Sequence, residues 1–201
     1  MSQEKLLLAT NNKGKVREYK SLLRGIPHQI VTPTDEGIAA EVEEDGSSFE
    51  ENARLKAATL AVASGLLTLA DDSGLEVDAL GGEPGVRSSR YAGDNATDAD
   101  RVDFLLNKLK DVPHQERTAR FRCVIAVARP GGQIETAEGA CDGYIATEPR
   151  GHNGFGYDPV FYLPEFGKTI AELPPEIKNR ISHRAMAAVK MRRLLQNLAA
   201  L

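Results

Sequence analysis

Residues 5–15 read KLLLATNNKGK, and this stretch decides the fold class. The apolar run at 5–9 predicts a short strand, which ends where the polar residues 10–15 begin. From Val16, apolar residues recur at helical spacing until Gly25. A strand, a loop and a helix in this order predict an α/β architecture.

The alternation of strand and helix patterns continues along the chain. Period and turn residues predict strands at 28–31, 66–70, 75–80, 119–128 and 160–163, helices at 49–61 and 96–109, and a helix near Pro174. A turn at 130–132 makes 119–128 the first arm of a long hairpin. A last helix begins near Ser182, with Met186, Val189 and Leu195 among its buried residues. We find no repeat or linker, so residues 1–201 are predicted to form a single α/β domain with a mixed sheet.

Composition excludes several classes of protein. Of 201 residues, 41% are hydrophobic and 27% are charged, which is typical of a globular domain. No apolar run approaches the roughly 18 residues of a membrane span, so no membrane association is expected. The net charge of −4 argues against nucleic acid as a partner. Cys123 and Cys141 are predicted to be reduced, in a cytoplasmic protein, and to be small buried residues rather than a disulfide.

The first loop has the character of an anion site. Free backbone N–H groups and the positive end of the helix dipole would meet there, beside two lysines, and a triphosphate is an obvious ligand. The alternative is a solvated loop with a helix cap. The residues concerned are Thr10, Asn11, Asn12, Lys13, Gly14 and Lys15.

Carboxylates gather at a second place. Asp71 and Asp72 follow a predicted strand, and Glu43 and Glu44 lie in an acidic loop upstream. Mg²⁺ takes a few carboxylates together with waters and substrate phosphates, and a cation would relieve the repulsion between neighbouring carboxylates. The alternative is a turn at 71–74, because Asp, Ser and Gly favour turns.

Three further motifs carry weaker signals. The glycine-rich loop 151–159 holds Phe155, on which a planar base could stack; the alternative is a tight connection with a buried ring. The stretch 182–184 reads SHR at a helix start and can direct donors at a ligand, or simply be a capped helix. Asn52 and Lys56, four residues apart, share one face of a helix.

Taken together, these motifs resemble the Ham1-like inosine/xanthosine triphosphate pyrophosphatases. The resemblance runs from about residue 5 to the final helix, in the family's order and spacing. It rests on 10–15, on FEENA at 49–53 with Lys56, on ADDSGL at 70–75, on FGYDP at 155–159 and on SHR at 182–184.

The resemblance implies a fold, an activity and a set of site residues. The fold would be an elongated, two-lobed α/β fold with a central mixed sheet flanked by helices and a nucleotide cleft between the lobes. The activity would be Mg²⁺-dependent hydrolysis of the deaminated purine nucleotides ITP, dITP and XTP to the monophosphate and pyrophosphate, by a homodimer.

Residues 10–15 and Lys56 would hold the triphosphate, and Asp72 with Glu43 or Glu44 would manage the metal and the attacking water. Ser73 would touch the substrate; Phe155, Gly156, Tyr157 and Asp158 would line the base and sugar pocket; Lys178, His183 and Arg184 would complete base recognition.

Two rival functions use the same residues. One is a nucleotide sensor that binds without hydrolysis, although binding an anion alone would avoid the carboxylate cluster. The other is a pyrophosphatase for other modified nucleotides. The sequence also leaves open whether Asp72 is the general base, a metal ligand or both.

Overall fold

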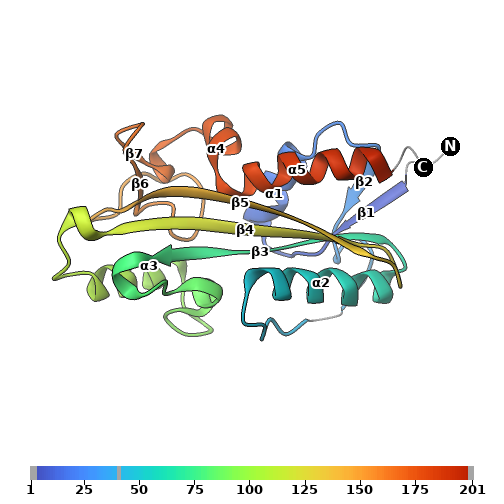
Figure 1. The fold of residues 1–201 in the computed structure, drawn as a ribbon, viewed down its shortest axis with the longest axis horizontal. Coiled ribbons are helices and arrows are strands. Elements are labelled where there is room, and N and C mark those ends of the chain that lie inside the picture. Colours follow the sequence, from blue (N-terminus) through green and yellow to red (C-terminus); the bar gives the residue numbers. More distant parts are fainter. Residues whose placement is uncertain (1–3, 40–41, 199–201) are drawn as a thin grey trace. The chain divides into compact units, whose positions relative to one another are not determined.

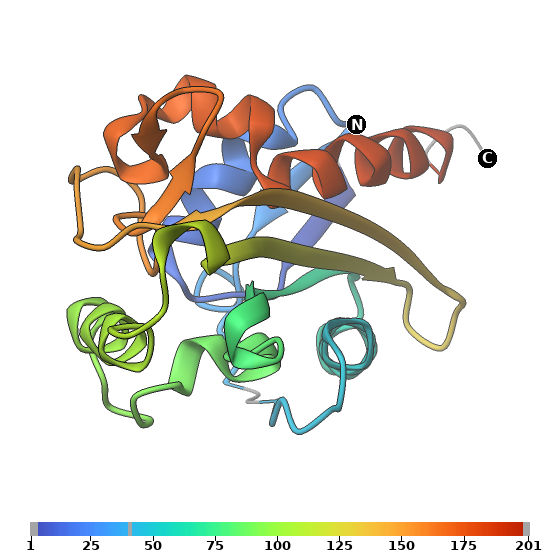
Figure 2. The same ribbon diagram turned by 60° about the vertical axis from the view of Figure 1, so that its left-hand side comes forward.

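The computed structural model describes residues 4–39 and 42–198 of the chain (Figures 1 and 2). Its strands are β1 (Glu4–Leu8), β2 (His28–Val31), β3 (Leu67–Val77), β4 (Thr118–Ala128), β5 (Ile134–Ile145), β6 (Phe161–Leu163) and β7 (Lys168–Thr169). Its α-helices are α1 (Lys13–Leu22), α2 (Phe49–Ser64), α3 (Asp98–Lys108), α4 (Pro175–Ile181) and α5 (His183–Leu198). Short 3₁₀ turns are η1 (Asp78–Leu80), η2 (Gly85–Arg90), η3 (His114–Glu116) and η4 (Ile170–Glu172). In the described residues, no helix combines the length and the apolar character that crossing a membrane requires.

The strands form one mixed sheet in the order β2-β1-β3-β4-β5-β6-β7. Strand β1 runs parallel to both of its neighbours, so that Leu7 lies opposite Val31 of β2 and Thr68 of β3. Strand β6 runs antiparallel to β5 and to β7. The predicted α/β class with a mixed sheet is therefore confirmed.

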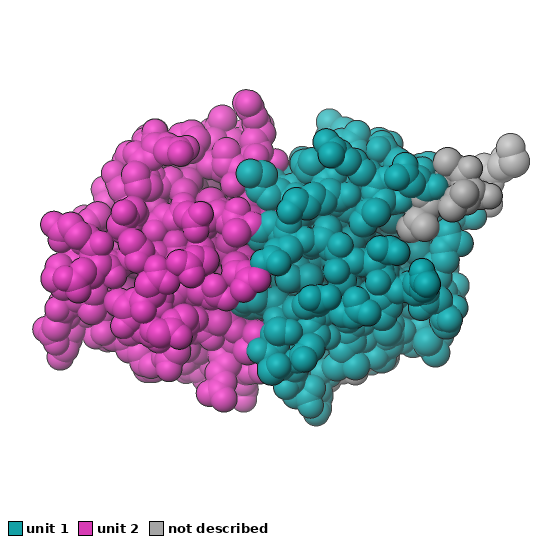
Figure 3. Space-filling model, in the orientation of Figure 1, with its two compact units in different colours: residues 1–72, 123–139, 184–201 teal, residues 73–122, 140–183 magenta. Residues whose placement is uncertain are grey.

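The chain divides into two compact units, coloured in Figure 3. Unit 1 contains residues 1–72, 123–139 and 184–201, and unit 2 contains residues 73–122 and 140–183. The boundaries fall inside β3, β4 and β5, and between His183 and Arg184.

Unit 1 has a core on a parallel part of the sheet. Leu6 and Leu8 of β1 pack with Leu69 of β3 and with Tyr19 of α1, and all four side chains are at most 1% exposed. Helices α1 and α5 cover one face of the sheet in this unit and α2 covers the other (Figures 1 and 2). Coverage on both faces explains why the run 6–8 is apolar without alternation.

Unit 2 has a second, separate core. Phe121 of β4 packs on Phe161 of β6 with ring centroids 4.5 Å apart, and Leu105 of α3 belongs to the same cluster. Helix α3 begins with a capping box, in which Thr97 accepts from the backbone N–H of Asp100 and the Asp100 carboxylate accepts from that of Thr97. Each satisfied cap group replaces a hydrogen bond that the helix end lacks.

Two predictions about local structure were wrong. Residues 71–74 are not a turn between strands, because β3 runs through them without interruption. The side chains of Asp71 and Asp72 are buried by partners from distant segments, which local turn propensity does not register. On α5, Met186 and Val189 are 49% and 55% exposed, because the buried face is built instead from small alanines such as Ala187.

We expect Leu69→Ala to destabilise the protein by about 2–5 kcal/mol, because it removes a fully buried side chain and leaves a cavity. Leu55→Ala is the matched control, since Leu55 is 43% exposed and its loss should cost less than about 0.5 kcal/mol. Urea unfolding followed by circular dichroism measures both. Equal losses would contradict the assignment of Leu69 to the core.

Candidate active site

The loop between β1 and α1 is organised by one side chain. The side-chain oxygen Oδ1 of Asn12 accepts hydrogen bonds from the backbone N–H groups of Gly14 and Lys15, at 2.8 and 3.1 Å, and so caps α1. Asn11 and Lys13 are exposed and Thr10 is half-buried. The loop therefore presents a lysine beside the positive end of a helix, as the anion-site prediction requires.

Asp71 of β3 is buried in unit 1 and pairs with two cationic side chains. Its carboxylate is 1% exposed, with Oδ1 3.0 Å from Nζ of Lys15 and Oδ2 3.4 Å from two guanidinium nitrogens of Arg184. Nη1 of Arg184 also donates to Glu18, at 2.7 Å. Burial alone would raise the pKa of Asp71, but the charges of Lys15 and Arg184 hold that pKa well below its ordinary value. Asp71 is therefore an ionised structural anchor.

Asp72 has a different environment from its neighbour. Its Oδ2 accepts a 2.9 Å hydrogen bond from the Asn52 side-chain amide of α2. Burial raises the pKa of Asp72, and the negative charge of Glu44 raises it further, against the effect of the Asn52 hydrogen bond. Of the two aspartates, Asp72 is therefore the one whose charge a bound proton or cation would stabilise more.

The acidic loop contributes one carboxylate to this region. Glu44 is half-buried and forms an ion pair with Lys56, whose ammonium also donates to the carbonyl oxygen of Asp71 at 3.3 Å. Glu43 is exposed. The structure therefore brings Glu44, Lys56 and Asp72 together and places Glu43 at the surface.

Unit 2 holds the glycine-rich loop and its partners. Lys178 of α4 forms a buried ion pair with Asp158 at 2.5 Å, and its ammonium lies 4.6 Å from the ring centroid of Phe155. The same Asp158 oxygen accepts from the backbone N–H of Phe155 at 2.9 Å. The loop therefore presents a half-buried aromatic ring that has a cation over it.

His183 and Ser73 are the remaining predicted residues of unit 2. His183 is buried and stacks on Phe121, with centroids 4.7 Å apart and planes 19° from parallel. Ser73 follows Asp72 directly in β3 and is half-buried. Because successive side chains of a strand point to opposite faces, Ser73 shares a face with Asp71.

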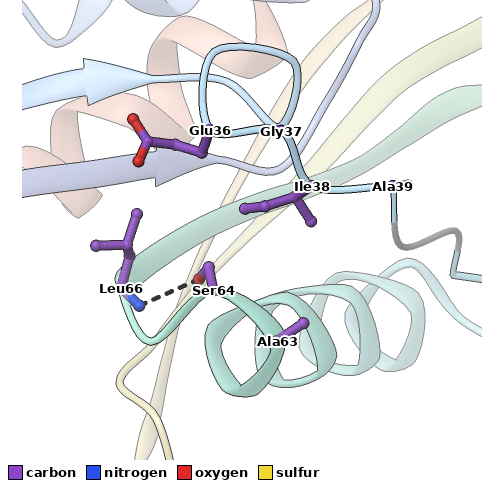
Figure 4. Close-up of a pocket in the computed structure, with 7 residues that line it drawn as sticks. All are labelled: Glu36, Gly37, Ile38, Ala39, Ala63, Ser64 and Leu66. Atoms are coloured by element: carbon purple, nitrogen blue, oxygen red, sulfur yellow. Dashed lines mark hydrogen bonds between the residues drawn. The ribbon is translucent and has the colours of Figure 1, made fainter.

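A cavity of about 460 Å³ lies elsewhere in unit 1 (Figure 4). It is lined by residues 36–39 and by Ala63, Ser64 and Leu66. The Ser64 hydroxyl is already used, since it donates to the Leu60 carbonyl and accepts from the N–H of Leu66. None of the predicted site residues lines this cavity.

Two members of the polar network were not predicted as site residues. Asn52 joins the acidic loop to Asp72, since its amide oxygen also accepts from the N–H of Gly46 at 2.8 Å. Glu18 shares Arg184 with Asp71. The helical spacing of Asn52 and Lys56 was a signal for the first. No local pattern marks Glu18, whose partner is 166 residues away.

These features define a mixed α/β protein in which a lysine-containing loop at a helix start lies beside buried carboxylates. The chain belongs to the Ham1 family, whose model matches residues 6–194. It is 54% identical over 194 residues to the dITP/XTP pyrophosphatase of Desulforamulus reducens, covering 96% of both chains. It is 53% identical to the dITP/XTP pyrophosphatase of Geobacillus kaustophilus, over 94% of this chain and 92% of that one.

A solved structure agrees with this assignment. The HAM1 protein from Coxiella burnetii superposes with a TM-score of 0.88 at 44% identity, over 96% of this chain and 99% of that chain. The family predicted from the sequence motifs is confirmed.

We expect Arg184→Met to destabilise the fold by about 3–5 kcal/mol at neutral pH, because it leaves buried Asp71 without one of its two cations. Arg54→Met is the control. Arg54 is 43% exposed, and loss of its pair with Glu50 should cost at most about 1 kcal/mol. Urea unfolding at fixed pH gives both values.

The loss at Arg184 should also depend on pH. The pKa of Asp71 is lower in the folded state than its ordinary value of 3.8. Its ionised form therefore stabilises the fold above pH 3.8, and this contribution disappears as the pH falls through the folded-state pKa. The difference between wild type and Arg184→Met should shrink below pH 3.8. A difference that stays constant with pH would contradict the pairing.

Proposed function

We propose that this chain hydrolyses the deaminated purine nucleotides ITP, dITP and XTP to the nucleoside monophosphate and pyrophosphate, and so removes them from the nucleotide pool. The observation that carries the proposal is the carboxylate site of Asp72 and Glu44 in a chain whose relatives are named dITP/XTP pyrophosphatases. Pyrophosphate release from ITP, measured beside ATP and GTP, tests it. A chain that binds ITP without releasing pyrophosphate would be a sensor instead.

The triphosphate is assigned to residues 10–15 and to Lys56. Exposed Lys13 and the N-terminus of α1 supply positive charge, and Lys15 stands beside them with Asp71 as its counter-ion. Lys56 is held by Glu44, and a phosphate oxygen would compete for the same ammonium.

The carboxylates fit a divalent cation. Glu44 lies near enough to Asp72 for its charge to raise the pKa of Asp72, and a cation between the two would relieve that repulsion. In residues 4–39 and 42–198, no three His, Cys, Asp or Glu side chains form a metal cluster. Mg²⁺ suits such a small donor set, since it is commonly held by one or two carboxylates together with waters and substrate phosphates. When bound, it neutralises charge on the reacting phosphates.

Asp72 is the residue assigned to the attacking water. A carboxylate whose pKa is raised is a better proton acceptor than an ordinary aspartate, and Asn52 fixes its orientation through the 2.9 Å hydrogen bond. Lys13 and Lys56 would stabilise the negative charge that develops on the phosphate chain. No nucleophilic side chain is needed for this reaction.

The base is assigned to unit 2, and a part for Arg184 of unit 1 stays a prediction from the resemblance. Phe155 offers a stacking surface, and His183 and Lys178 offer donors to the oxygen at C6, which adenine lacks. A site built to hydrogen-bond that oxygen would reject ATP by about 10⁴-fold. Because Arg184 also neutralises Asp71, a substitution there reports on stability as well as on base recognition.

The remaining features of the proposal concern organisation and setting. The family model spans both compact units, which supports one functional domain over residues 1–201. A homodimer, a cytoplasmic location and the nucleotide cleft stay predictions. The net charge of −4 supports a small nucleotide rather than nucleic acid as the partner. Sedimentation of the purified chain would test the dimer.

Asp72→Asn should reduce pyrophosphate release from ITP by about 10²-fold or more while the protein still folds, because the change keeps the shape and removes the charge. Asp111→Asn is the control, since the Asp111 side chain is 89% exposed. Turnover by Asp72→Asn within a few-fold of wild type at saturating Mg²⁺ would remove Asp72 from the mechanism.

Lys13→Ala should weaken binding of ITP by about tenfold or more and leave IMP binding nearly unchanged, since a lost charge-assisted hydrogen bond to a phosphate costs roughly 1.5–3 kcal/mol. Lys20→Ala removes the same charge from the other end of α1 and serves as the control. Calorimetric titration with a non-hydrolysable analogue and with IMP measures the two affinities. Equal losses for both ligands would move Lys13 away from the phosphates.

A further inference from the structure

The glycine-rich loop contains three glycines in the left-handed region of backbone conformation. Gly151, Gly154 and Gly156 have φ angles of +83°, +80° and +62°, a region that other residues rarely adopt. Glycine also loses more conformational freedom on folding than other residues, so a loop of this composition needs fixed attachments. Around Phe155, these attachments come from other segments of unit 2.

Two neighbouring residues of the loop are attached to other parts of unit 2. The backbone N–H of Gly156 donates a 2.7 Å hydrogen bond to Oδ2 of Asp98, in the first turn of α3. The Tyr157 hydroxyl donates to the carbonyl oxygen of Ser88 in η2, at 2.9 Å, and Tyr157 is 4% exposed. The loop is therefore held from two sides immediately after Phe155.

Asp98 is itself held by a cation. Arg101, three residues further along α3, forms an ion pair with the other oxygen of Asp98. The Arg101 guanidinium also donates to the carbonyl oxygen of Ser89, at 2.9 Å, and to that of Ala96, at 2.6 Å. The Asp98 carboxylate thus connects the loop to α3 and, through Arg101, to the segment that holds Tyr157.

The attachment of Gly156 bears directly on the aromatic ring. Phe155 precedes Gly156, its N–H is bound to Asp158, and the ammonium of Lys178 lies over its ring. The N–H of the peptide between Phe155 and Gly156 is bound by Asp98, and its carbonyl oxygen accepts from the N–H of Asp158 at 3.3 Å. The hydrogen bond to Asp98 is therefore one of two that fix this peptide, and with it the backbone that carries the ring.

We propose that Asp98 is a positioning residue, whose carboxylate fixes Gly156 and thereby keeps Phe155 and Asp158 in the arrangement that receives the nucleoside. The inference rests on the proposed function, because it assigns the glycine-rich loop to base and sugar binding. Asp98 would act on nucleoside affinity and leave the phosphate chemistry of Asp72 unchanged.

The experiment compares three variants of the full chain. Asp98→Ala removes the acceptor for Gly156, and Asp98→Asn keeps an oxygen acceptor but loses the charge. Asp100→Ala is the matched control, since it removes a carboxylate from the same turn and breaks the capping box without touching the loop. The Asp98 side chain is 49% exposed, so its removal strands no fully buried charge. Urea unfolding verifies that each variant is folded.

Two readouts separate positioning from a structural role. Hydrogen exchange followed by mass spectrometry reports on the Gly156 amide without any substrate. Steady-state kinetics with ITP, and inhibition by inorganic tripolyphosphate, separate nucleoside binding from phosphate binding.

We expect Asp98→Ala to accelerate exchange at Gly156 and to raise KM for ITP by about tenfold, the effect of losing one charge-assisted hydrogen bond. In Asp98→Ala, kcat and the inhibition constant of tripolyphosphate should stay within about twofold of wild type. Asp98→Asn should give an exchange rate and a KM between those of wild type and Asp98→Ala. Asp100→Ala should change neither the exchange rate nor the KM.

An unchanged KM in Asp98→Ala, an equal rise in Asp100→Ala, or an equal loss of tripolyphosphate binding would each overturn the assignment, whatever the exchange data show. If the wild type releases no pyrophosphate from ITP, the proposed function fails instead. The exchange of Gly156 and the affinities for IMP and tripolyphosphate then decide on Asp98 separately.

Discussion

The carboxylate of Asp71 has almost no exposed surface, and an ion removed from water to this extent is stable only beside opposite charge. Lys15 supplies one cation from α1 and Arg184 supplies the other from α5, so the start of each helix is tied to the same point of β3. Lys15, in the loop to which we assign the triphosphate, is therefore oriented by the carboxylate of Asp71. These three charges thus connect α1, β3 and α5 within unit 1.

Asp71 and Asp72 are neighbours in the chain but have different electrostatic environments. Because they are consecutive in a strand, their side chains point to opposite faces of the sheet. One face carries α1 and α5 and offers two cations to Asp71, whereas the other carries α2, which offers Asp72 the amide of Asn52 and a lysine, Lys56, already paired with Glu44 (Figure 1). The pKa of Asp71 is lowered and that of Asp72 is raised. Environments that push two carboxylate pKa values apart in this way allow different roles, and we assign the attacking water to Asp72 alone.

In unit 2, a few polar groups make several of the hydrogen bonds around the ring of Phe155. A single oxygen of Asp158 accepts from the Phe155 N–H and from Lys178, while Asp98 and Ser88 accept from the two residues that follow. Glycines give the chain the turns it needs, and these bonds then remove the freedom that glycine brings. The conformation of the loop to which we assign the nucleoside therefore depends on residues outside the loop as well as on those within it.

The sequence by itself determined the α/β class, the loop that follows β1 and the family, because hydrophobic period, helix caps and motif spacing are local properties of the chain. Only the tertiary structure decided that β3 continues through residues 71–74, that Glu44 rather than Glu43 lies beside Asp72, and that Met186 faces outward. The physical reason is the same in each case. Burial and pairing with charges from distant segments, such as Arg184 with Asp71, outweigh local propensity. The residues next to these positions in the sequence do not indicate such pairing.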